Sequence, residues 1–409
     1  MRFITKLFKR LICTIVILLI IANVFIVVTG RFYLYKGIAY TYLSGETGPT
    51  IYDLEKFPNA RIKKSVTPVD WRLSPYFNKV KLTNSQEKYF ENLETKAILV
   101  FQNNHILYER YWDDHTSSTL SNSFSAAKTV VSLLVGIAID QNKIKSLDDK
   151  VGEYLPAFNS NGKEKITIRH LLMMSSGLDW EESGKNPLSD NAASYYGENL
   201  YDLVMDQNAI ETPGKRFNYQ SGNSQLLGYI VETATGLSLN EYAQQNIWSK
   251  IGTKEDAYWS LDSKDGDEKA FCCMYASPRD FGRLGKLISQ HGKWGDKPII
   301  SEKYIKEMFQ NPVMETEYTK DNYQYGLHIW TYLGDDNPIY YCRGILGQYV
   351  ISIPDENIVI VRLGSKRGKT VTIDKLKENS LEKQYKAGHP EDFFELVSFG
   401  QKVVKELKK

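Results

Sequence analysis

The spacing of hydrophobic residues changes several times along the chain. The first distinct segment is an uncharged, apolar run at residues 11–30. At about 1.5 Å per residue, a helix of this length spans the roughly 30 Å hydrocarbon core of a bilayer. Basic residues cluster just before the run, and fewer follow it closely. The positive-inside rule therefore predicts a cytoplasmic segment at 1–10, a transmembrane anchor at 11–30 and the rest of the chain outside the cytoplasm. A cleaved signal peptide is the alternative, although the run ends in Val-Val-Thr-Gly and not in a small-x-small site.

Residues 31–67 have few periodic apolar positions and carry several glycines and prolines. This composition predicts a stalk, or a strap laid over the surface of the following domain. That domain is expected to begin near Pro68 and to run to Lys409.

Both ends of this domain predict β-strands. Residues 96–102 and 105–111 are rich in strand-forming side chains and are separated only by an Asn-Asn turn. Near the other end, residues 338–364 contain two runs rich in Ile, Val and Tyr around the turn Pro-Asp-Glu-Asn. We therefore expect an antiparallel sheet built from the two ends of the domain.

The remaining periodic segments predict helices. Residues 125–141 are apolar on nearly every side, which is typical of a helix buried between layers. Residues 147–280 contain mainly helical patterns and loops, and residues 391–408 have apolar side chains at helical spacing. The sequence thus predicts an α+β fold, in which an antiparallel sheet is flanked by helices and carries an inserted helical lobe, behind one transmembrane helix.

Composition narrows the function classes. A hydrophobic fraction of 42% and a charged fraction of 24% are ordinary for a globular protein, and a net charge of +2 gives no reason to expect a nucleic-acid partner. The six histidines are scattered and the four cysteines form no C-x-x-C pair, so no metal or other cofactor is expected. Adjacent cysteines rarely bridge each other, so Cys272 and Cys273 are expected to be free thiols like Cys13, and a link from either one to Cys342 stays open.

Ser125 and Lys128 form an S-x-x-K motif, and residues at i and i+3 share one face of a helix. If Ser125 begins the helix, its hydroxyl lies at the positive end of the helix dipole. A neighbouring amine whose pKa is lowered by burial can accept the proton of such a serine. The motif occurs four times, but only this copy opens a long apolar helix; the others begin at Ser85, Ser160 and Ser380.

Two further elements carry candidate chemistry. Tyr219 follows a Pro-Gly turn and precedes an apolar helix, which is a rigid support for a functional side chain. With 27 tyrosines in the chain, a packing role is the alternative for Tyr219. The segment 342–349 opens a strand and contains two glycines, which indicate either a β-bulge or a close approach of the backbone to a ligand.

The order and spacing of these three elements resemble the β-lactamase-related serine hydrolases. That family includes class C β-lactamases, D-alanyl-D-alanine peptidases, family VIII esterases and aminohexanoate-oligomer hydrolases. Residues 166–178, 257–262 and 276–285 are also similar to stretches of the family. The likeness covers residues 68–409 and implies the β-lactamase/transpeptidase-like fold.

The resemblance implies a role for each matching residue. Ser125 would be the acylated nucleophile, Lys128 its hydrogen-bonded neighbour and Tyr219 the proton-transfer partner. The tyrosine triplet, Y-x-N in much of the family, here ends in Ser221, and Cys342-Arg343-Gly344 stands where K-T-G or H-x-G is usual. The Y-x-S triplet looks more like the oligomer hydrolases and esterases than like true β-lactamases, and Cys342 leaves out the cationic first residue that helps to grip a substrate carboxylate.

The same resemblance implies an oxyanion hole made by the backbone N–H groups of Ser125 and Ile345. It also implies a substrate-binding surface formed by Ser221, Cys342, Arg343 and Gly344. Arg343 offers a cation one position after the usual one, although the alternation of strand faces argues against a simple replacement.

We therefore expect a serine hydrolase that cleaves an ester, an amide or a short peptide through a Ser125 acyl-enzyme, outside the cytoplasm and attached to the cell membrane. One alternative is a D-amino-acid peptidase of the cell wall or a weak β-lactamase. Another is a catalytically silent binding or sensory module on the same fold.

Overall fold

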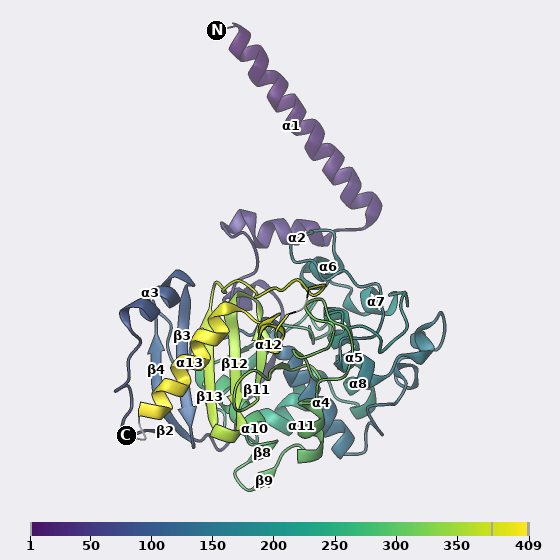
Figure 1. Cartoon of the computed structure of the whole chain (residues 1–409). Coiled ribbons are helices and arrows are strands. Elements are labelled where there is room, and N and C mark those ends of the chain that lie inside the picture. The colour runs from purple at the N-terminus through teal and green to yellow at the C-terminus, as the bar shows by residue number, and fades with distance from the viewer. Residues whose placement is uncertain (1, 378, 407–409) are drawn as a thin grey trace.

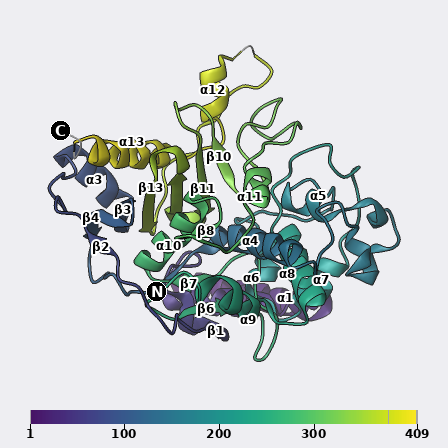
Figure 2. The ribbon, with the colours of Figure 1, turned by 90° about the horizontal axis from the view of Figure 1, so that it is seen from below.

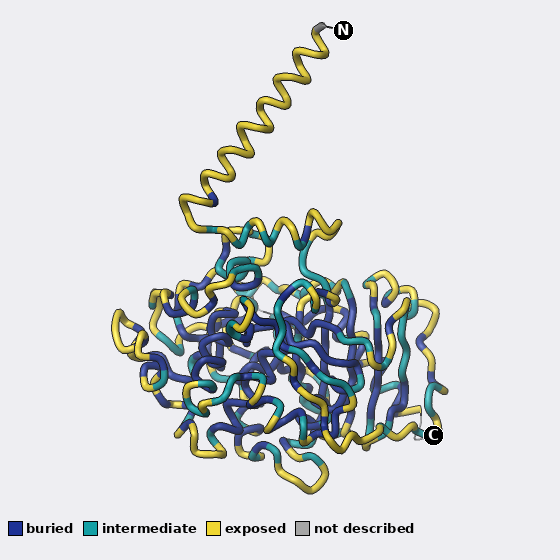
Figure 3. The backbone as a smooth tube through the Cα atoms, turned by 180° about the vertical axis from the view of Figure 1, so that it is seen from behind, coloured by how far each residue is buried: buried dark blue, intermediate teal, exposed yellow. Residues whose placement is uncertain are grey.

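The computed structural model describes residues 2–377 and 379–406, and its most prominent feature is a long helix that stands clear of the domain. This helix, α1 (Arg2–Thr29), is exposed along almost its whole length (Figure 3). The stretch Phe3–Thr29 has the length and hydropathy of a membrane anchor or a signal sequence. A short helix, α2 (Tyr33–Tyr40), follows and lies across the face of the domain from which α1 projects (Figure 1).

The domain is organised around a seven-stranded sheet in the order β10-β11-β12-β13-β3-β4-β2. The two ends of the domain meet at its centre, where β13 pairs antiparallel with β3 and Ile360 lies opposite Val100. This confirms the predicted sheet and both hairpins. The strands are β2 (Arg72–Leu73), β3 (Thr95–Gln102), β4 (His105–Tyr111), β10 (Trp330–Tyr332), β11 (Ile339–Gly344), β12 (Gln348–Ile353) and β13 (Ile358–Gly364).

One edge of the sheet departs from the prediction of a purely antiparallel arrangement. The two-residue strand β2 pairs with β4 in parallel, with Arg72 opposite His105. A parallel neighbour requires a long connection, and the chain between β2 and β4 supplies it by way of α3 (Asn84–Asn92) and β3.

Helices cover both faces of the sheet (Figure 2). α10 (Pro278–Ser289) packs on β12 and β13, and α13 (Glu391–Glu406) packs on the opposite face. A Cβ added to Gly282 would lie 2.5 Å from the Phe101 ring, and one added to Gly285 would lie 2.5 Å from Val359, so these glycines let α10 approach the sheet closely. The predicted C-terminal helix is confirmed as far as Glu406, and its last positions, up to 408, lie outside the described residues.

The helical lobe lies beside this sheet, and its centre is the contact between α4 (Ala127–Asp140) and α8 (Ser221–Thr235). Every residue of α4 from Ala127 to Ala138 is buried, as its apolar pattern predicts. The other helices of the domain are α5 (Ile168–Leu172), α6 (Asp190–Tyr196), α7 (Leu200–Met205), α9 (Leu239–Ala243), α11 (Glu302–Met308) and α12 (Leu381–Lys386).

A second, four-stranded sheet supports the start of α4, and it draws on the segment that precedes position 68. Its order is β1-β6-β7-β5, and the first strand comes from residues 59–62. The strands are β1 (Asn59–Ile62), β5 (Ser121–Asn122), β6 (Ala257–Ser260) and β7 (Met274–Ala276), and a separate small hairpin joins β8 (Lys293–Trp294) to β9 (Lys297–Pro298). The boundaries proposed from the sequence for the anchor, the strap and the hydrolase domain stay predictions.

The cysteines differ from the expectation. Cys272 and Cys273 form a disulfide, so the prediction of free thiols at these positions is wrong. The bond forms inside a tight turn just before β7, where Cys273 has a φ of 67° and the two sulfur atoms are brought together. Cys13 and Cys342 are free, and no link to Cys342 exists.

Candidate active site

A cavity of about 640 Å³ opens where the start of α4, the start of α8 and the end of β11 meet. The sequence-predicted residues that line it are Ser125, Tyr219, Ser221, Arg343, Gly344 and Ile345. Three segments that are far apart in sequence therefore converge on one site.

Ser125 lies on a strained turn at the entrance to α4. It belongs to a short 3-10 turn, Phe124–Ala126, and Phe124 has a φ of 46°, which is unusual for a bulky residue. The backbone N–H of Phe124 donates to Asn122 Oδ1 at 2.8 Å and fixes this turn. Ser125 is partly exposed in the cavity. The turn thus exposes a serine hydroxyl to a substrate at the N-terminal end of a long helix, where the helix dipole stabilises negative charge.

Lys128 is fully buried behind this serine, and three oxygen atoms surround its amine. Its Nζ donates to Ser125 Oγ at 3.2 Å, to Ser221 Oγ at 3.0 Å and to the carbonyl of Phe271 at 2.7 Å. Burial lowers the pKa of Lys128 to about 8, although the negative charge of Glu182 opposes the change. A substantial fraction of the amine is therefore neutral near physiological pH and able to accept a proton.

Ser221 links Lys128 to a carboxylate that the sequence did not single out. Glu182 accepts the backbone N–H and the hydroxyl of Ser221, both at 2.7 Å, and the indole N–H of Trp180 at 2.8 Å. Burial raises the pKa of Glu182, while Lys128 and the donors from Ser221 and Trp180 pull it down. Because Ser221 is the first residue of α8, the carboxylate also faces the positive end of that helix.

Tyr219 is held by aromatic packing beside the nucleophile. Its ring stacks on Trp330 with centroids 5.8 Å apart and meets Tyr325 edge-on at 6.0 Å. The Lys128 amine lies 5.2 Å from the ring centre. Burial and Glu182 raise the pKa of Tyr219 well above 10, and a hydrogen bond with Ser125 lowers it only in part. Tyr219 is therefore a protonated phenol at neutral pH, which suits it to donate or relay a proton.

The end of β11 forms the opposite wall, but Cys342 does not take part in it. Cys342 is completely buried, does not line the cavity, and has a pKa raised to about 12 by that burial. Neighbouring residues of a strand point to opposite faces, so Arg343 lines the cavity instead and places its guanidinium over the Trp330 ring. The assignment of Cys342 to the substrate-binding surface is thus corrected.

The close packing of β11 against the nucleophile's turn explains why residue 344 is a glycine. A Cβ on Gly344 would lie 2.2 Å from the carbonyl oxygen of Ser123, so any larger residue would push β11 away from the turn that holds Ser125. The strand ends at Gly344, and Leu346 takes a φ of 62° in the turn that follows. Ile345 therefore lies at the cavity edge next to the nucleophile's turn.

Arg367 is a second residue that the sequence did not indicate. It lines the cavity from the loop after β13, and both Arg343 and Arg367 lower the pKa of Tyr219 through their charge. Within residues 2–377 and 379–406, no group of three or more His, Cys, Asp or Glu side chains is arranged to hold a metal ion.

A family model described as Beta-lactamase matches residues 89–382, which is most of the chain. The chain belongs to the β-lactamase family. It is 24% identical to the 6-aminohexanoate-dimer hydrolase of Paenarthrobacter ureafaciens over 303 residues, covering 68% of this chain and 74% of that one. It is 26% identical to the teichoic acid D-alanine hydrolase of Staphylococcus aureus (strain MRSA252) over 335 residues, covering 72% and 77%.

Among solved structures, a proposed 6-aminohexanoate-dimer hydrolase from Bacillus anthracis superposes with a TM-score of 0.69 at 18% identity, covering 87% of this chain and 92% of that one. At this identity the superposition supports the β-lactamase/transpeptidase-like fold alone. The family assignment and the fold expected from the three motifs are confirmed, and relatives named as amide and D-alanine hydrolases support a hydrolase.

Proposed function

We propose that this β-lactamase-family member is a serine hydrolase that cleaves an ester or amide bond through an acyl-enzyme on Ser125. The observation that supports this most strongly is the Lys128 amine, which is buried, has a pKa of about 8 and lies 3.2 Å from Ser125 Oγ. A lysine that served only as a structural cation would be expected to keep an ion-pair partner, and Lys128 contacts only neutral oxygen atoms directly.

The reaction runs in two steps. Neutral Lys128 accepts the hydroxyl proton as Ser125 Oγ attacks the carbonyl carbon, and the oxyanion is held by the backbone N–H groups of Ser125 and Ile345. Tyr219 then donates its phenol proton to the departing alcohol or amine, and Lys128 passes the proton that it took from Ser125 back to Tyr219. Water then attacks the acyl-enzyme by the same route in reverse, which releases the acid and restores Ser125.

The pKa shifts of Tyr219 and Lys128 indicate which of the two residues acts as the base. The family resemblance made Tyr219 the proton-transfer partner of Ser125, with Lys128 as its hydrogen-bonded neighbour. Because burial raises the pKa of Tyr219 and lowers that of Lys128, the amine is the stronger candidate for the base and the phenol for the relay.

The substrate is proposed to be a simple ester or amide in preference to a β-lactam. Cys342 is buried where much of the family carries a lysine or histidine, and Ser221 is turned toward Lys128 and Glu182. A lost charge-assisted hydrogen bond costs roughly 1.5–3 kcal/mol, or about one to two decades in rate, for a substrate that is anchored by its carboxylate.

A cell-wall D-amino-acid peptidase or weak β-lactamase is the second candidate, and the observation in its favour is the cationic side chain of Arg367 at the cavity. Such a cation offers a substitute anchor for a substrate carboxylate. The proposed location is the outer side of the cell membrane, with α1 as a single-pass anchor.

The test compares kcat/KM for p-nitrophenyl acetate, a short amide oligomer, a D-Ala-D-Ala peptide and nitrocefin, in the wild type and in Ser125→Ala. We expect the ester or amide to be the best substrate and all turnover to require Ser125. Equal or better turnover of nitrocefin would contradict the ester or amide assignment and favour the second candidate. Full turnover by Ser125→Ala would reject the mechanism.

A further inference from the structure

The active-site cavity shares a wall with the helix that follows the apolar anchor. Besides the catalytic residues, the cavity is lined by Tyr33, Leu34, Gly37, Ile38 and Thr41 of α2 and the turn after it. The nucleophile and this helix therefore border one continuous space.

The anchor is joined to the domain without a flexible linker. Only three residues separate the end of α1 at Thr29 from the start of α2 at Tyr33. The Tyr35 hydroxyl donates to Asn23 Oδ1 of α1 at 2.6 Å, and the Tyr33 hydroxyl donates to the carbonyl of Pro187 at 3.1 Å. Lys36 forms an ion pair with Glu198 at 3.2 Å. These contacts connect α1 to α2, and α2 to the loop and helix beside the cavity.

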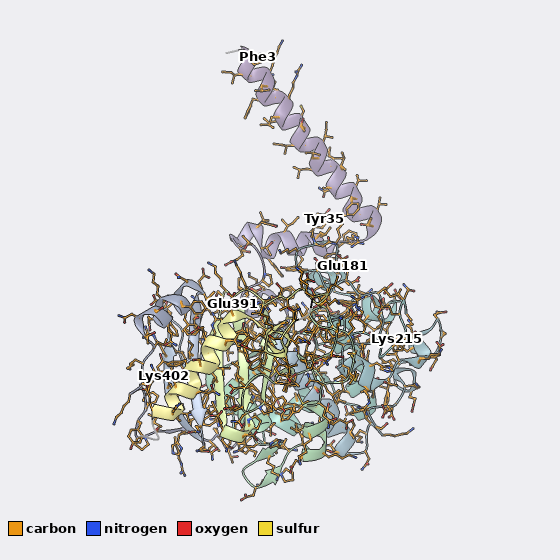
Figure 4. All side chains as sticks on the ribbon, in the orientation of Figure 1. Phe3, Tyr35, Glu181, Lys215, Glu391 and Lys402 are labelled. Carbon is orange, nitrogen blue, oxygen red and sulfur yellow. A yellow bond between two sulfur atoms is a disulfide. The ribbon has the colours of Figure 1, made fainter. Side chains whose placement is uncertain are left out.

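The outer face of α2 is apolar and exposed. Phe32, Tyr35 and Ala39 follow one another at helical spacing along α2, Leu43 lies in the 3-10 turn after it (Tyr42–Ser44), and none of the four lines the cavity. Phe32 is 57% exposed and Leu43 is 79% exposed. In Figure 4, Tyr35 lies on the side of the domain from which α1 projects. An amphipathic helix with aromatic residues on its apolar face, next to a membrane-spanning helix, is typical of a segment that lies in the membrane interface.

The cavity also carries an excess of positive charge. Lys185, Arg343 and Arg367 line it, whereas its one lining carboxylate, Glu182, is engaged by Ser221 and Trp180. Lys185 and Arg367 form no ion pair within the part of the chain that the structure describes. Cationic side chains at a membrane surface attract anionic headgroups.

We propose that α2 lies in the membrane interface and that the cavity takes its ester or amide from an anionic amphiphile anchored in the same membrane. This inference rests on the proposed function of Ser125. With α2 in the interface, the wall of the cavity that α2 forms lies within about one helix diameter, roughly 10 Å, of the membrane surface. The substrate's acyl bond then reaches Ser125 past Leu34 and Ile38 while its lipid part stays in the bilayer, and its negative charge is held by Lys185 and Arg367.

The experiment uses the full chain in phosphatidylcholine vesicles and three substrates that carry the same butyryl ester of glycerol. The first is phosphatidylglycerol butyrylated on its headgroup glycerol, the second is soluble butyryl glycerophosphate, and the third is monobutyrin. Comparing the three separates the effect of membrane anchoring from the effect of negative charge. We expect the initial rate at equal total substrate to be at least ten-fold higher for the anchored ester than for monobutyrin, with butyryl glycerophosphate between them.

The variant Phe32→Ser/Leu43→Ser removes exposed apolar surface from the residue before α2 and from the turn after it, and leaves the cavity lining intact. We expect it to lose most of the preference for the anchored ester while keeping the monobutyrin rate. The matched control is Val313→Ser/Leu376→Ser, which alters two side chains that are exposed by 90% and 86% and that belong neither to α2 nor to the cavity lining, and it should behave as wild type.

Equal rates for the anchored and soluble esters in the wild type would overturn this inference and leave the hydrolase assignment intact. So would an unchanged preference in Phe32→Ser/Leu43→Ser, which is the result expected if that face binds a protein partner instead. If none of the three esters is cleaved in a Ser125-dependent way, the proposed function fails and this inference fails with it.

Discussion

Replacing Glu182 by glutamine should shift the pH dependence of the reaction to lower pH. In the proposed mechanism the neutral form of Lys128 is the base, so log kcat/KM for an uncharged ester rises with pH and levels off above the pKa of Lys128, about 8. The charge of Glu182 raises that pKa. Removing the charge therefore lowers the pKa of Lys128 and increases the fraction of neutral amine at pH 7.

The size of the shift follows from the geometry. Lys128 Nζ and Glu182 Oε1 are both bonded to Ser221 Oγ, at 3.0 and 2.7 Å, so they lie no more than about 6 Å apart. At that distance two unit charges interact by about 3 kcal/mol at an effective dielectric constant of about 20, and by about 0.7 kcal/mol in bulk water. These energies correspond to about two and about half a pH unit. We expect a shift within this range.

The assay is the pH profile of kcat/KM for p-nitrophenyl acetate, measured in the wild type, Glu182→Gln and the control Glu181→Gln. Glu181 is the adjacent, exposed carboxylate, and it contacts Asn186 instead of Ser221. The control should keep the wild-type inflection. An inflection in Glu182→Gln that stays at the wild-type pH, or moves upward, would refute either the ionised state of Glu182 or the role of Lys128 as the base. A lower plateau with an unmoved inflection would mean that Glu182 acts only in positioning.

Three further experiments test other parts of the site. Gly344→Ala should lower kcat/KM at least about ten-fold, because its Cβ would displace β11 from Ser123. The control Gly184→Ala has no atom within 4 Å of the added Cβ and should keep the wild-type value. Equal kcat/KM in the two variants would contradict the close approach at Gly344. Cys342→Lys should lower the free energy of unfolding by at least about 2 kcal/mol without improving turnover of β-lactams, because it buries a charge; thermal denaturation beside Cys342→Ala checks this. Dithiothreitol should slow the wild type several-fold, because the Phe271 carbonyl that accepts from Lys128 directly precedes the Cys272–Cys273 bridge. Cys272→Ser/Cys273→Ser should be slow without the reagent and insensitive to it. An equally active reduced enzyme would show that the bridge does not support Lys128.

The parts of the fold that rest on local periodicity were predictable from the sequence. The two hairpins follow from runs of strand-forming side chains around short turns, the buried helix α4 from a long run that is apolar on nearly every side, and the amphipathic helix α13 from apolar side chains at helical spacing. The meeting of β13 with β3 was predictable as well, because strands at the two ends of a domain need partners.

The site was only partly predictable, because some of its contacts depend on tertiary structure. Ser125, Lys128 and Tyr219 carry motif spacing that the sequence reveals. Glu182 and Arg367 stand in loops without a periodic pattern, and only the folded chain brings them to the cavity. A weak signal for Glu182 was available, since it follows closely the family-like segment that ends at residue 178.

Two other features were missed for related reasons. The bridge between Cys272 and Cys273 depends on a left-handed backbone conformation at the second cysteine, which composition does not indicate. The helix α2 is too short for its periodicity to stand out, and its place against the cavity comes from contacts with the loop and helix at residues 187–198. The alternation of side chains along β11, in contrast, did point to opposite orientations for Cys342 and Arg343.

The most direct test of the central claim is to locate the acyl group on the enzyme. Wild-type protein is mixed with a slowly turned-over p-nitrophenyl ester or a fluorophosphonate, quenched, digested and mapped by mass spectrometry. We expect one adduct per chain, on the peptide that contains Ser125, with none in Ser125→Ala and far slower labelling in Lys128→Ala. An adduct on another residue, or turnover by a folded Ser125→Ala at the wild-type rate, would contradict it.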